Sequence, residues 1–368
     1  MTDGTGWDDA SQFFADVHRM LTRLAGRVPD EMLTRLRELF GSGDLRYLPD
    51  AVSVAAVELD VPLTPADRDL LAHILDVLDV PGGKPQLFDR VPVAADPSAV
   101  GPFRFLPVRP AVLAEAGPRV PPRLDLTGGD PDDLTDLPPE LRSLADLANR
   151  LTEPSDDTAM VTLTVEPGVV GVWRAWRVGT DQEAAARPVY LAEVAPGVPA
   201  WDLAYDTQRS LAEDGDPAPQ VEVWWTGDVL PAYHRLALAG AALLWTPEVG
   251  RVRLALGAEQ LTDLVRSGAP RVPVPERRML AERLAAGAAV PGRAERLPDL
   301  VEPGRGEVVP GGYRTDGRWV WPEALGYYLT EYGVAPPREL TEALAGGGAT
   351  TPASQVAAFR ASLALSGR

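Results

Sequence analysis

The sequence contains no cysteine, which excludes disulfides, thiolate nucleophiles, cysteine-ligated zinc and iron–sulfur clusters. Histidine is almost as scarce, because only His18, His73 and His234 are present. Three residues so far apart in the chain do not suggest a histidine metal triad. The phosphate-binding motif G-x-x-x-x-G-K-[ST], the hydrolase motif G-x-S-x-G and the zinc-protease motif H-E-x-x-H are also missing. We therefore expect no cofactor and no resident metal.

Long apolar runs are missing as well. The longest candidate, Leu236–Trp245, has ten residues, which is too short to cross a bilayer and predicts a buried helix or strand. The first residues, Met1–Gly4, include an acid and show neither the basic nor the apolar part of a secretory leader. These patterns predict a cytoplasmic protein without a membrane span.

Basic residues are fewer than acidic residues. The chain has 35 Lys and Arg and 53 Asp and Glu, which gives a formal net charge of −18. A nucleic acid or an anionic membrane would repel such a chain, so neither is an expected partner. A protein partner with a basic surface is favoured instead. The 45% hydrophobic content is typical of a folded protein, and the length suggests about two to three domains.

Residues 1–80 show the pattern of a small helical bundle. Apolar residues recur every three or four positions over Trp7–Leu24 and again over Asp30–Gly41. Pro49 suits the first turn of a third helix, and Thr64-Pro65 suits the N-cap and first position of a fourth.

Residues 81–140 hold 13 prolines. Proline removes backbone donors and disfavours helix at the preceding residue, so this region predicts an extended linker. One strand is expected at 103–108, and a helix is expected at 139–151.

Residues 141–270 change to the two-residue period of strands. Val161–Val165 and Val170–Val178 alternate on either side of the turn signal Glu166-Pro167-Gly168, which predicts a hairpin. Strands mixed with helices and opened by a hairpin indicate an α+β fold with a mixed sheet. Further strands are expected at 188–194, 220–225 and 252–256, and helices at 201–212 and 230–243.

Residues 271–368 form the last predicted region, a helix, hairpin and helix packed on the α+β domain, with the first helix at 276–286. Asp316-Gly317 between β-prone residues is the signal for a two-residue type I′ turn. This turn would pair Arg314 with Trp319 and would place both, together with Trp321, on one face of the hairpin. A guanidinium could then stack on an indole. Pro322 would begin a helix at its first position.

That helix would carry two stripes at helical spacing. One should face the core, and the other should expose aromatic and acidic groups. The first stripe holds Trp321, Leu325, Tyr328 and Tyr332, and the second holds Glu323, Tyr327 and Glu331. Because Tyr, Trp and Arg are enriched at binding hot spots, the segment predicts a recognition surface. The alternative is that the aromatics only join the last helix to the sheet.

The pair Trp224-Trp225 lies on a predicted strand, where neighbouring side chains point to opposite faces. Either one indole is exposed for binding, or a helix covers each face. Both alternatives remain open from the sequence. The candidate binding residues are therefore Arg314, Asp316, Arg318, Trp319, Trp321, Glu323, Tyr327, Glu331 and Trp225.

The segment Tyr313-Arg314-Thr315-Asp316-Gly317-Arg318-Trp319-Val320-Trp321-Pro322-Glu323 is followed by Tyr327-Tyr328-Leu329 and Tyr332-Gly333. It resembles a C-terminal signature of uncharacterised actinobacterial proteins, some of which look like accessory or immunity components of polymorphic-toxin loci. The resemblance covers only this segment. It implies a binding role and no catalytic residue.

Two function hypotheses follow. The first is a non-catalytic protein-binding module, an immunity or regulatory partner of a basic protein. The second is an enzyme with a cleft between the α+β domain and the C-terminal hairpin, using Arg314, Asp316, Glu323 and His234. An aromatic neighbourhood could raise a carboxyl pKa there, as acid–base chemistry requires. The lack of a recognisable nucleophile or metal cluster favours the first hypothesis.

Overall fold

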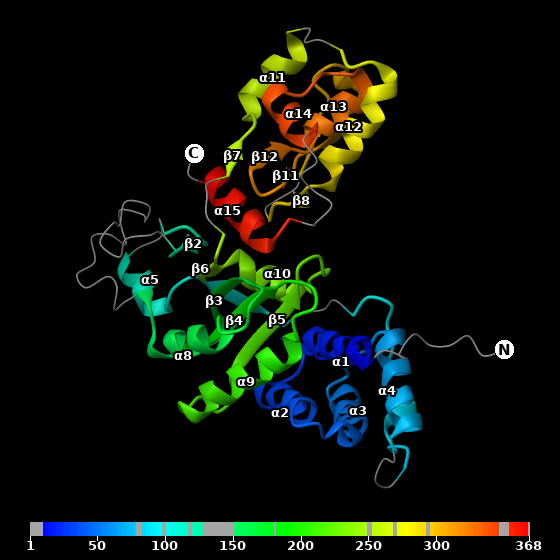
Figure 1. The fold of residues 1–368 in the computed structure, drawn as a ribbon, viewed down its shortest axis with the longest axis vertical. Coiled ribbons are helices and arrows are strands. Elements are labelled where there is room, and N and C mark those ends of the chain that lie inside the picture. Colours follow the sequence, from blue (N-terminus) through cyan, green and yellow to red (C-terminus); the bar gives the residue numbers. More distant parts are fainter. Residues whose placement is uncertain are drawn as a thin grey trace, which may run out of the picture. The chain divides into compact units, whose positions relative to one another are not determined.

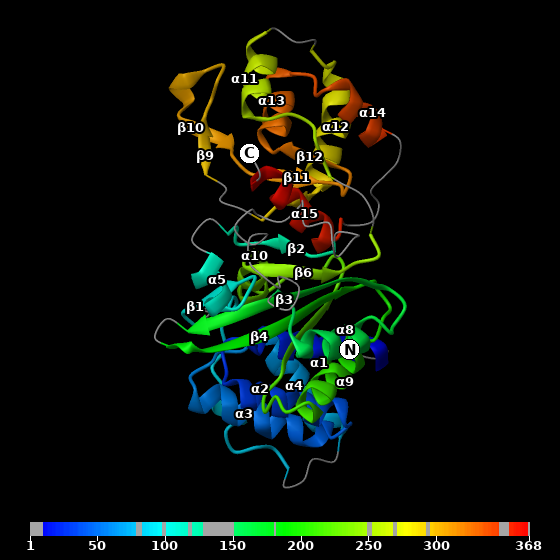
Figure 2. The same ribbon diagram turned by 90° about the vertical axis from the view of Figure 1, so that its left-hand side faces the viewer.

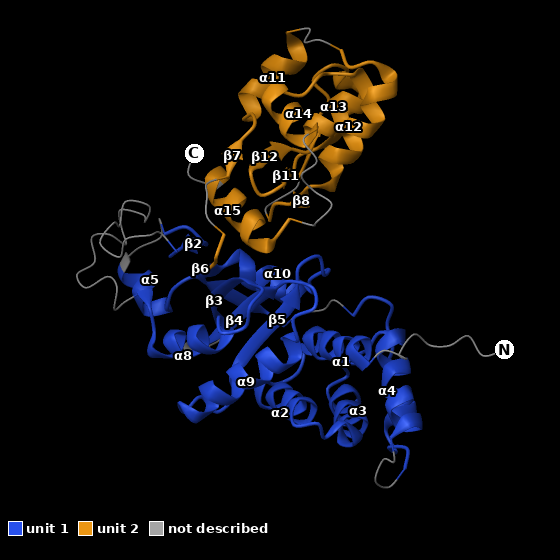
Figure 3. Cartoon of the chain, viewed as in Figure 1, with its two compact units in different colours: residues 1–245 blue, residues 246–368 orange. Residues whose placement is uncertain are grey.

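The chain forms two units, residues 1–245 and residues 246–368 (Figure 3). The first unit combines the N-terminal helices, part of the proline-rich region and a central sheet, where the sequence suggested separate parts and a later boundary near residue 270. The computed structural model describes residues 10–78, 83–97, 101–116, 120–127, 151–179, 182–248, 252–267, 271–291, 295–345 and 353–366.

Four helices begin the first unit, as the sequence predicts. They are α1 (Ala10–Leu24), α2 (Asp30–Gly41), α3 (Leu48–Glu58) and α4 (Pro65–Val77). Thr64 caps α4, because its hydroxyl accepts the N–H of Asp67 while the Asp67 carboxylate accepts the N–H of Thr64. Trp7, expected in the first helix, lies outside the described residues.

Six strands of the described residues form a mixed sheet in this unit (Figures 1 and 2). The order is β2-β6-β3-β4-β5, and β1 also pairs with β3. The pairs β4–β5 and β2–β6 are parallel, and the others are antiparallel. The strands are β1 (Phe103–Leu106), β2 (Leu124–Asp125), β3 (Val169–Gly179), β4 (Gln182–Val194), β5 (Gln220–Trp225) and β6 (Ala241–Trp245). The predicted α+β class is confirmed.

Helices cover both faces of the sheet at the tryptophan pair. Trp225 packs beside α9 in a core cluster, whereas Trp224 stacks on Trp173 and meets the ring of His234 on α10 edge-on. Their exposures are 7% and 2%, so the covered alternative is the one observed. The helices of this sheet are α5 (Pro110–Ala116), α8 (Pro154–Leu163), α9 (Ala200–Glu213) and α10 (Ala232–Ala239).

Two predicted elements are wrong. The strand predicted at 161–165 is instead the last turn of α8, up to Leu163, and the two residues after it, because Pro154 occupies the first turn of this helix and Glu153 forms a capping box with Asp156. The hairpin is therefore β3–β4. The helix predicted at 230–243 ends at Ala239 with Gly240 as its C-cap, and strand β6 follows. A Cβ at Gly240 would lie 2.2 Å from the carbonyl oxygen of Phe105. Only glycine allows that approach.

The proline-rich region is more than a linker, since it supplies the strands β1 and β2 and the helix α5. The helix expected at 139–151 lies outside the described residues, except for its last position. No helix of the described residues is long and apolar enough to cross a membrane.

The second unit is built around the four-stranded sheet β7-β12-β11-β8 and a separate β9–β10 pair. Its core contains Trp321, Leu325, Tyr328 and Leu329, so the first predicted stripe does face inward, with Tyr332 half-buried. Its helices are α11 (Ala258–Arg266), α12 (Val274–Ala286), α13 (Ala324–Tyr332), α14 (Arg338–Ala345) and α15 (Gln355–Ser366). Its strands are β7 (Arg253–Leu254), β8 (Ala288–Ala289), β9 (Arg296–Pro298), β10 (Glu307–Pro310), β11 (Tyr313–Thr315) and β12 (Trp319–Pro322).

Candidate functional site

The chain reverses between β11 and β12, as the Asp-Gly signal predicts, but in a wider turn. Thr315 pairs with Val320, so four residues form the connection instead of two. The Asp316 carboxylate accepts the N–H groups of Arg318 and Trp319 at 2.9 and 2.7 Å, and Gly317 takes a φ of +91°. These side-chain contacts stabilise the longer turn.

The predicted register is therefore wrong by two residues. Arg314 lies opposite Trp321, where the two-residue turn would have paired it with Trp319. A shift of two keeps the same face, since side chains alternate with period two, so all three residues still share one face. The guanidinium over the Trp319 ring is not that of Arg314 but that of Arg253, at 6.0 Å from the ring centre.

The start of the last predicted helix is also wrong. Pro322 is the final residue of β12 and pairs with Tyr313, and α13 begins at Ala324. The backbone N–H of Glu323 still donates to the carbonyl oxygen of Gly312 at 2.8 Å. Strand pairing therefore continues past the proline, which lacks a donor and is tolerated at the end of a strand.

A cavity of about 430 Å³ lies in this unit and gathers five of the nine predicted residues. The five are Arg314, Trp321, Glu323, Tyr327 and Glu331. Strands β11 and β12 supply the first two, and the second stripe of the helix region supplies the others. The remaining lining residues are Ala281, Leu284 and Ala285 of α12, Pro310 of β10, and Gly326 and Thr330 of α13.

An ion pair crosses the cavity lining. Arg314 Nε lies 2.9 Å from Glu323 Oε1, and the two side chains are 32% and 22% exposed. Arg314 Nη1 also donates to the carbonyl oxygens of Ala285 and Gly287, each at 2.8 Å. The guanidinium is thus held between the end of α12 and the start of α13, which fixes this side of the cavity.

Tyr327 is fixed by a second polar cluster around Asp299. The hydroxyls of Tyr327 and Tyr332 donate to Asp299 Oδ2 at 2.8 and 2.6 Å, and Arg305 pairs with Glu331 at 3.1 Å. Burial tends to raise the pKa of Asp299, but hydrogen bonds from the two phenols and from backbone N–H groups hold it below its usual value. Burial and the bond to Asp299 raise the pKa of Tyr327. Both groups therefore keep their ordinary charge at neutral pH.

The four other predicted residues do not line this cavity. Asp316 belongs to the turn, Arg318 is exposed beside it, and Trp319 is half-buried in contact with Arg253. Trp225 is in the core of the other unit, where its Nε1 donates to the carbonyl oxygen of Val198 at 2.7 Å.

Sequence reasoning missed Asp299 and Arg305, which lie in residues 291–312, a stretch rich in glycine and proline and without a helix or strand period. They meet Tyr327 and Glu331 from more than twenty residues away, and no local period could signal those contacts. Among the described residues, no group of three or more His, Asp or Glu could hold a metal ion. No protein family, no curated protein and no solved structure matches this chain.

Proposed function

We propose that this chain is a non-catalytic protein-binding module whose C-terminal cavity receives a basic side chain of a partner protein. The observation that carries the proposal is the convergence of Arg314, Trp321, Glu323, Tyr327 and Glu331 on one cavity. Aromatic and arginine side chains around a recess are the usual composition of a binding hot spot.

The lining suits the long side chain of lysine or arginine. Leu284, Trp321 and Tyr327 offer apolar surface for the aliphatic part of such a side chain. Glu323 and Glu331 already pair with Arg314 and Arg305, each through one oxygen, so the second oxygen of each carboxylate is the acceptor for a donor of the partner. Glu331 is on the exposed side, at 39% side-chain exposure. A bound cation would meet an aromatic ring and a carboxylate together, a favourable setting for both cation–π and charge-assisted contacts.

The net charge of −18 supports a partner of opposite charge. Such attraction chiefly speeds association and falls as salt rises. A role as an immunity or regulatory partner of a basic protein is the specific form of this proposal. It rests on the resemblance of the C-terminal segment.

The residues considered for catalysis have other contacts in the structure. Asp316 holds the turn, and Arg314 and Glu323 pair with each other. His234 is 0% exposed in the first unit and pairs with Glu222 at 2.9 Å. No observation at these residues favours the enzyme hypothesis over binding.

Gly326 offers a direct test, because it lines the cavity on α13 and a Cβ there would meet no atom within 4 Å. The change Gly326→Met should fill the cavity without backbone strain. Ala345→Met places the same side chain at an exposed position of α14 and serves as the matched control. Thermal unfolding should show that both variants fold.

The assay is selection from a displayed library of random peptides, followed by affinity measurement of the enriched peptides. We expect Lys or Arg beside an apolar residue to be enriched. Their binding should be lost in Gly326→Met and kept in Ala345→Met. Enrichment of acidic peptides, or equal binding by both variants, would reject the cavity as the recognition site.

A further inference from the structure

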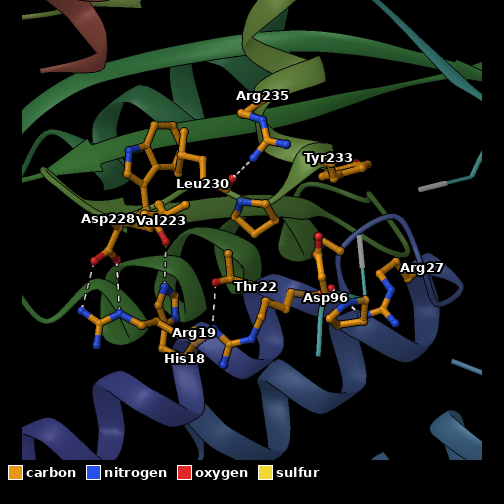
Figure 4. A pocket seen from close by; sticks show the side chains of 17 residues that line it. His18, Arg19, Thr22, Arg27, Asp96, Val223, Asp228, Leu230, Tyr233 and Arg235 are labelled. Atoms are coloured by element: carbon orange, nitrogen blue, oxygen red, sulfur yellow. Dashed lines mark hydrogen bonds and ion pairs between the residues drawn. The ribbon is translucent and has the colours of Figure 1, made fainter. Parts of the chain in front are cut away.

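A second cavity, of about 530 Å³, lies entirely in the first unit and is distinct from the site described above (Figure 4). It is bounded by α1, by the end of β5, and by the loop that leads into the first turn of α10. Asp96 and Pro97 close another side. Its volume lies within the range of small-molecule sites.

Four arginines line this cavity, although residues 1–245 hold 39 acidic and only 20 basic side chains, a net of −19. Two of them have carboxylate partners. Arg19 pairs with Asp16 and Asp228 at 3.3 and 3.2 Å, and Arg23 pairs with Asp67. Their charges are therefore balanced within the protein.

The other two arginines have only backbone partners among the described residues. Arg27 donates to the carbonyl oxygens of Arg23 and Pro62, and Arg235 donates to that of Leu230. Asp96 also lines the cavity, near Arg27 in Figure 4, but does not come within the 4.0 Å of an ion pair. Burial lowers the pKa of the Arg27 guanidinium, and the charge of Asp67, the partner of Arg23, acts in the opposite direction. A carbonyl satisfies a donor without neutralising its charge, so Arg235, and Arg27 to the extent that Asp67 does not balance it, still favour an anion.

Further donors and apolar surface lie on the same cavity wall. Ala232 is the first residue of α10 and follows the N-cap Pro231, which has no N–H itself; the first amides of a helix, from Ala232 onward, have no acceptor within the helix. Val229, in the loop before them, is 93% exposed at the cavity and would be covered by an apolar group of a ligand. His18 adds no charge at neutral pH, because burial lowers its pKa to about 4, and its Nε2 hydrogen-bonds the carbonyl oxygen of Val223 at 2.7 Å within the core.

We propose that this cavity binds a small organic phosphate. The phosphate would lie between Arg27, Arg235 and the first turn of α10, and the apolar part against Val229. A carboxylate has two oxygens that accept hydrogen bonds, whereas a phosphate monoester has three terminal oxygens. The N–H donors of two guanidiniums and of the helix amides therefore match a phosphate better than a carboxylate. The inference is independent of the binding function proposed for the other unit.

The test is calorimetric titration of the full chain with three probes. Phenyl phosphate carries both expected parts, inorganic phosphate lacks the apolar part, and phenylacetate replaces the phosphate with a carboxylate. We expect phenyl phosphate to bind most tightly. Losing one charge-assisted contact in Arg27→Gln or Arg235→Gln should weaken its binding about tenfold to hundredfold.

Arg209→Gln is the matched control, because Arg209 is 60% exposed on α9 and lies outside the cavity. It should bind phenyl phosphate like the wild type. The proposal is overturned if phenyl phosphate does not bind, if phenylacetate binds equally well, or if the control loses as much affinity as the cavity variants. The comparison of probes on the wild type decides the matter even if one arginine variant fails to fold.

Discussion

His18 should make the first unit sensitive to mild acid. Its side chain is buried at 5% exposure, its Nε2 lies 2.7 Å from the carbonyl oxygen of Val223, and its ring meets Trp225 edge-on. Burial, with a smaller contribution from the charge of Arg37, lowers the pKa of His18 from 6.5 to about 4. The folded chain therefore keeps this ring neutral over a range where the unfolded chain protonates it.

The sign and the size follow from that difference. Stability is full above pH 6.5 and falls as the pH drops toward 4, because the unfolded state then binds the extra proton. One pKa unit corresponds to about 1.4 kcal/mol, so roughly 2 kcal/mol is lost by about pH 5 and roughly 3 kcal/mol by about pH 4. Glu222 acts at lower pH, since its folded pKa is lowered to about 2 and its contribution remains complete above 4.5.

Urea unfolding followed by tryptophan fluorescence, at about pH 7.5 and about pH 5, measures this loss. In His18→Gln the amide can still donate to Val223 but cannot titrate, so the variant should lose about 2 kcal/mol less than the wild type over this interval. His73→Gln, at a partly exposed position of α4, is the matched control and should follow the wild type. If His18→Gln and the wild type lose equal stability, the buried ring is not the acid-sensitive group.

Three further outcomes are expected from denaturant unfolding. Gly326→Ala should stabilise the second unit by about 0.5–1 kcal/mol, because the site is open and alanine favours helix, and no gain would show the space to be occupied. Arg174→Met should cost about 3–5 kcal/mol by leaving the buried Asp156 carboxylate without its charged partner, and adding Asp156→Asn should recover part of the loss, because the amide removes the charge and keeps an acceptor for the N–H of Glu153. Gly26→Ala should destabilise the first unit, since its φ is +70° and the new Cβ would lie 2.2 Å from the Tyr233 ring; a neutral result would contradict that contact.

The helices and strands that the sequence predicts correctly are determined by residues within or next to each element. The capping pair at Thr64, the helix over α9 and the strand over β5 are each specified by a few adjacent residues. The errors occur where distant contacts decide. Nothing near Gly240 shows that Phe105 lies against it, or that residues 241–245 pair with β2 and β3 as a central strand. The β-branched residues of α8 likewise suggest a strand until the cap at Glu153 is recognised.

The candidate site was predictable in composition but not in geometry. The predicted face of Arg314, Trp319 and Trp321 is correct although the predicted register is wrong. The register error is two residues, which is the period of a strand. Helical spacing likewise predicts that Glu323, Tyr327 and Glu331 lie on one side of the helix region, and in the structure all three line the cavity. What holds them there could not be predicted, because Asp299 contacts α13 across a connection with no periodic pattern.

The net negative charge of the chain is not shared equally between the two units. Residues 246–368 hold 15 basic and 14 acidic side chains, so they are nearly neutral, and the excess of acid belongs to residues 1–245. Attraction of a basic partner would therefore originate mainly in one unit, while the cavity proposed to hold it belongs to the other. Because diffuse attraction acts on encounter and close contacts act on release, added salt should slow association more than it speeds dissociation. A partner whose dissociation rate responded more strongly to salt would be held by exposed charges and not by the C-terminal cavity.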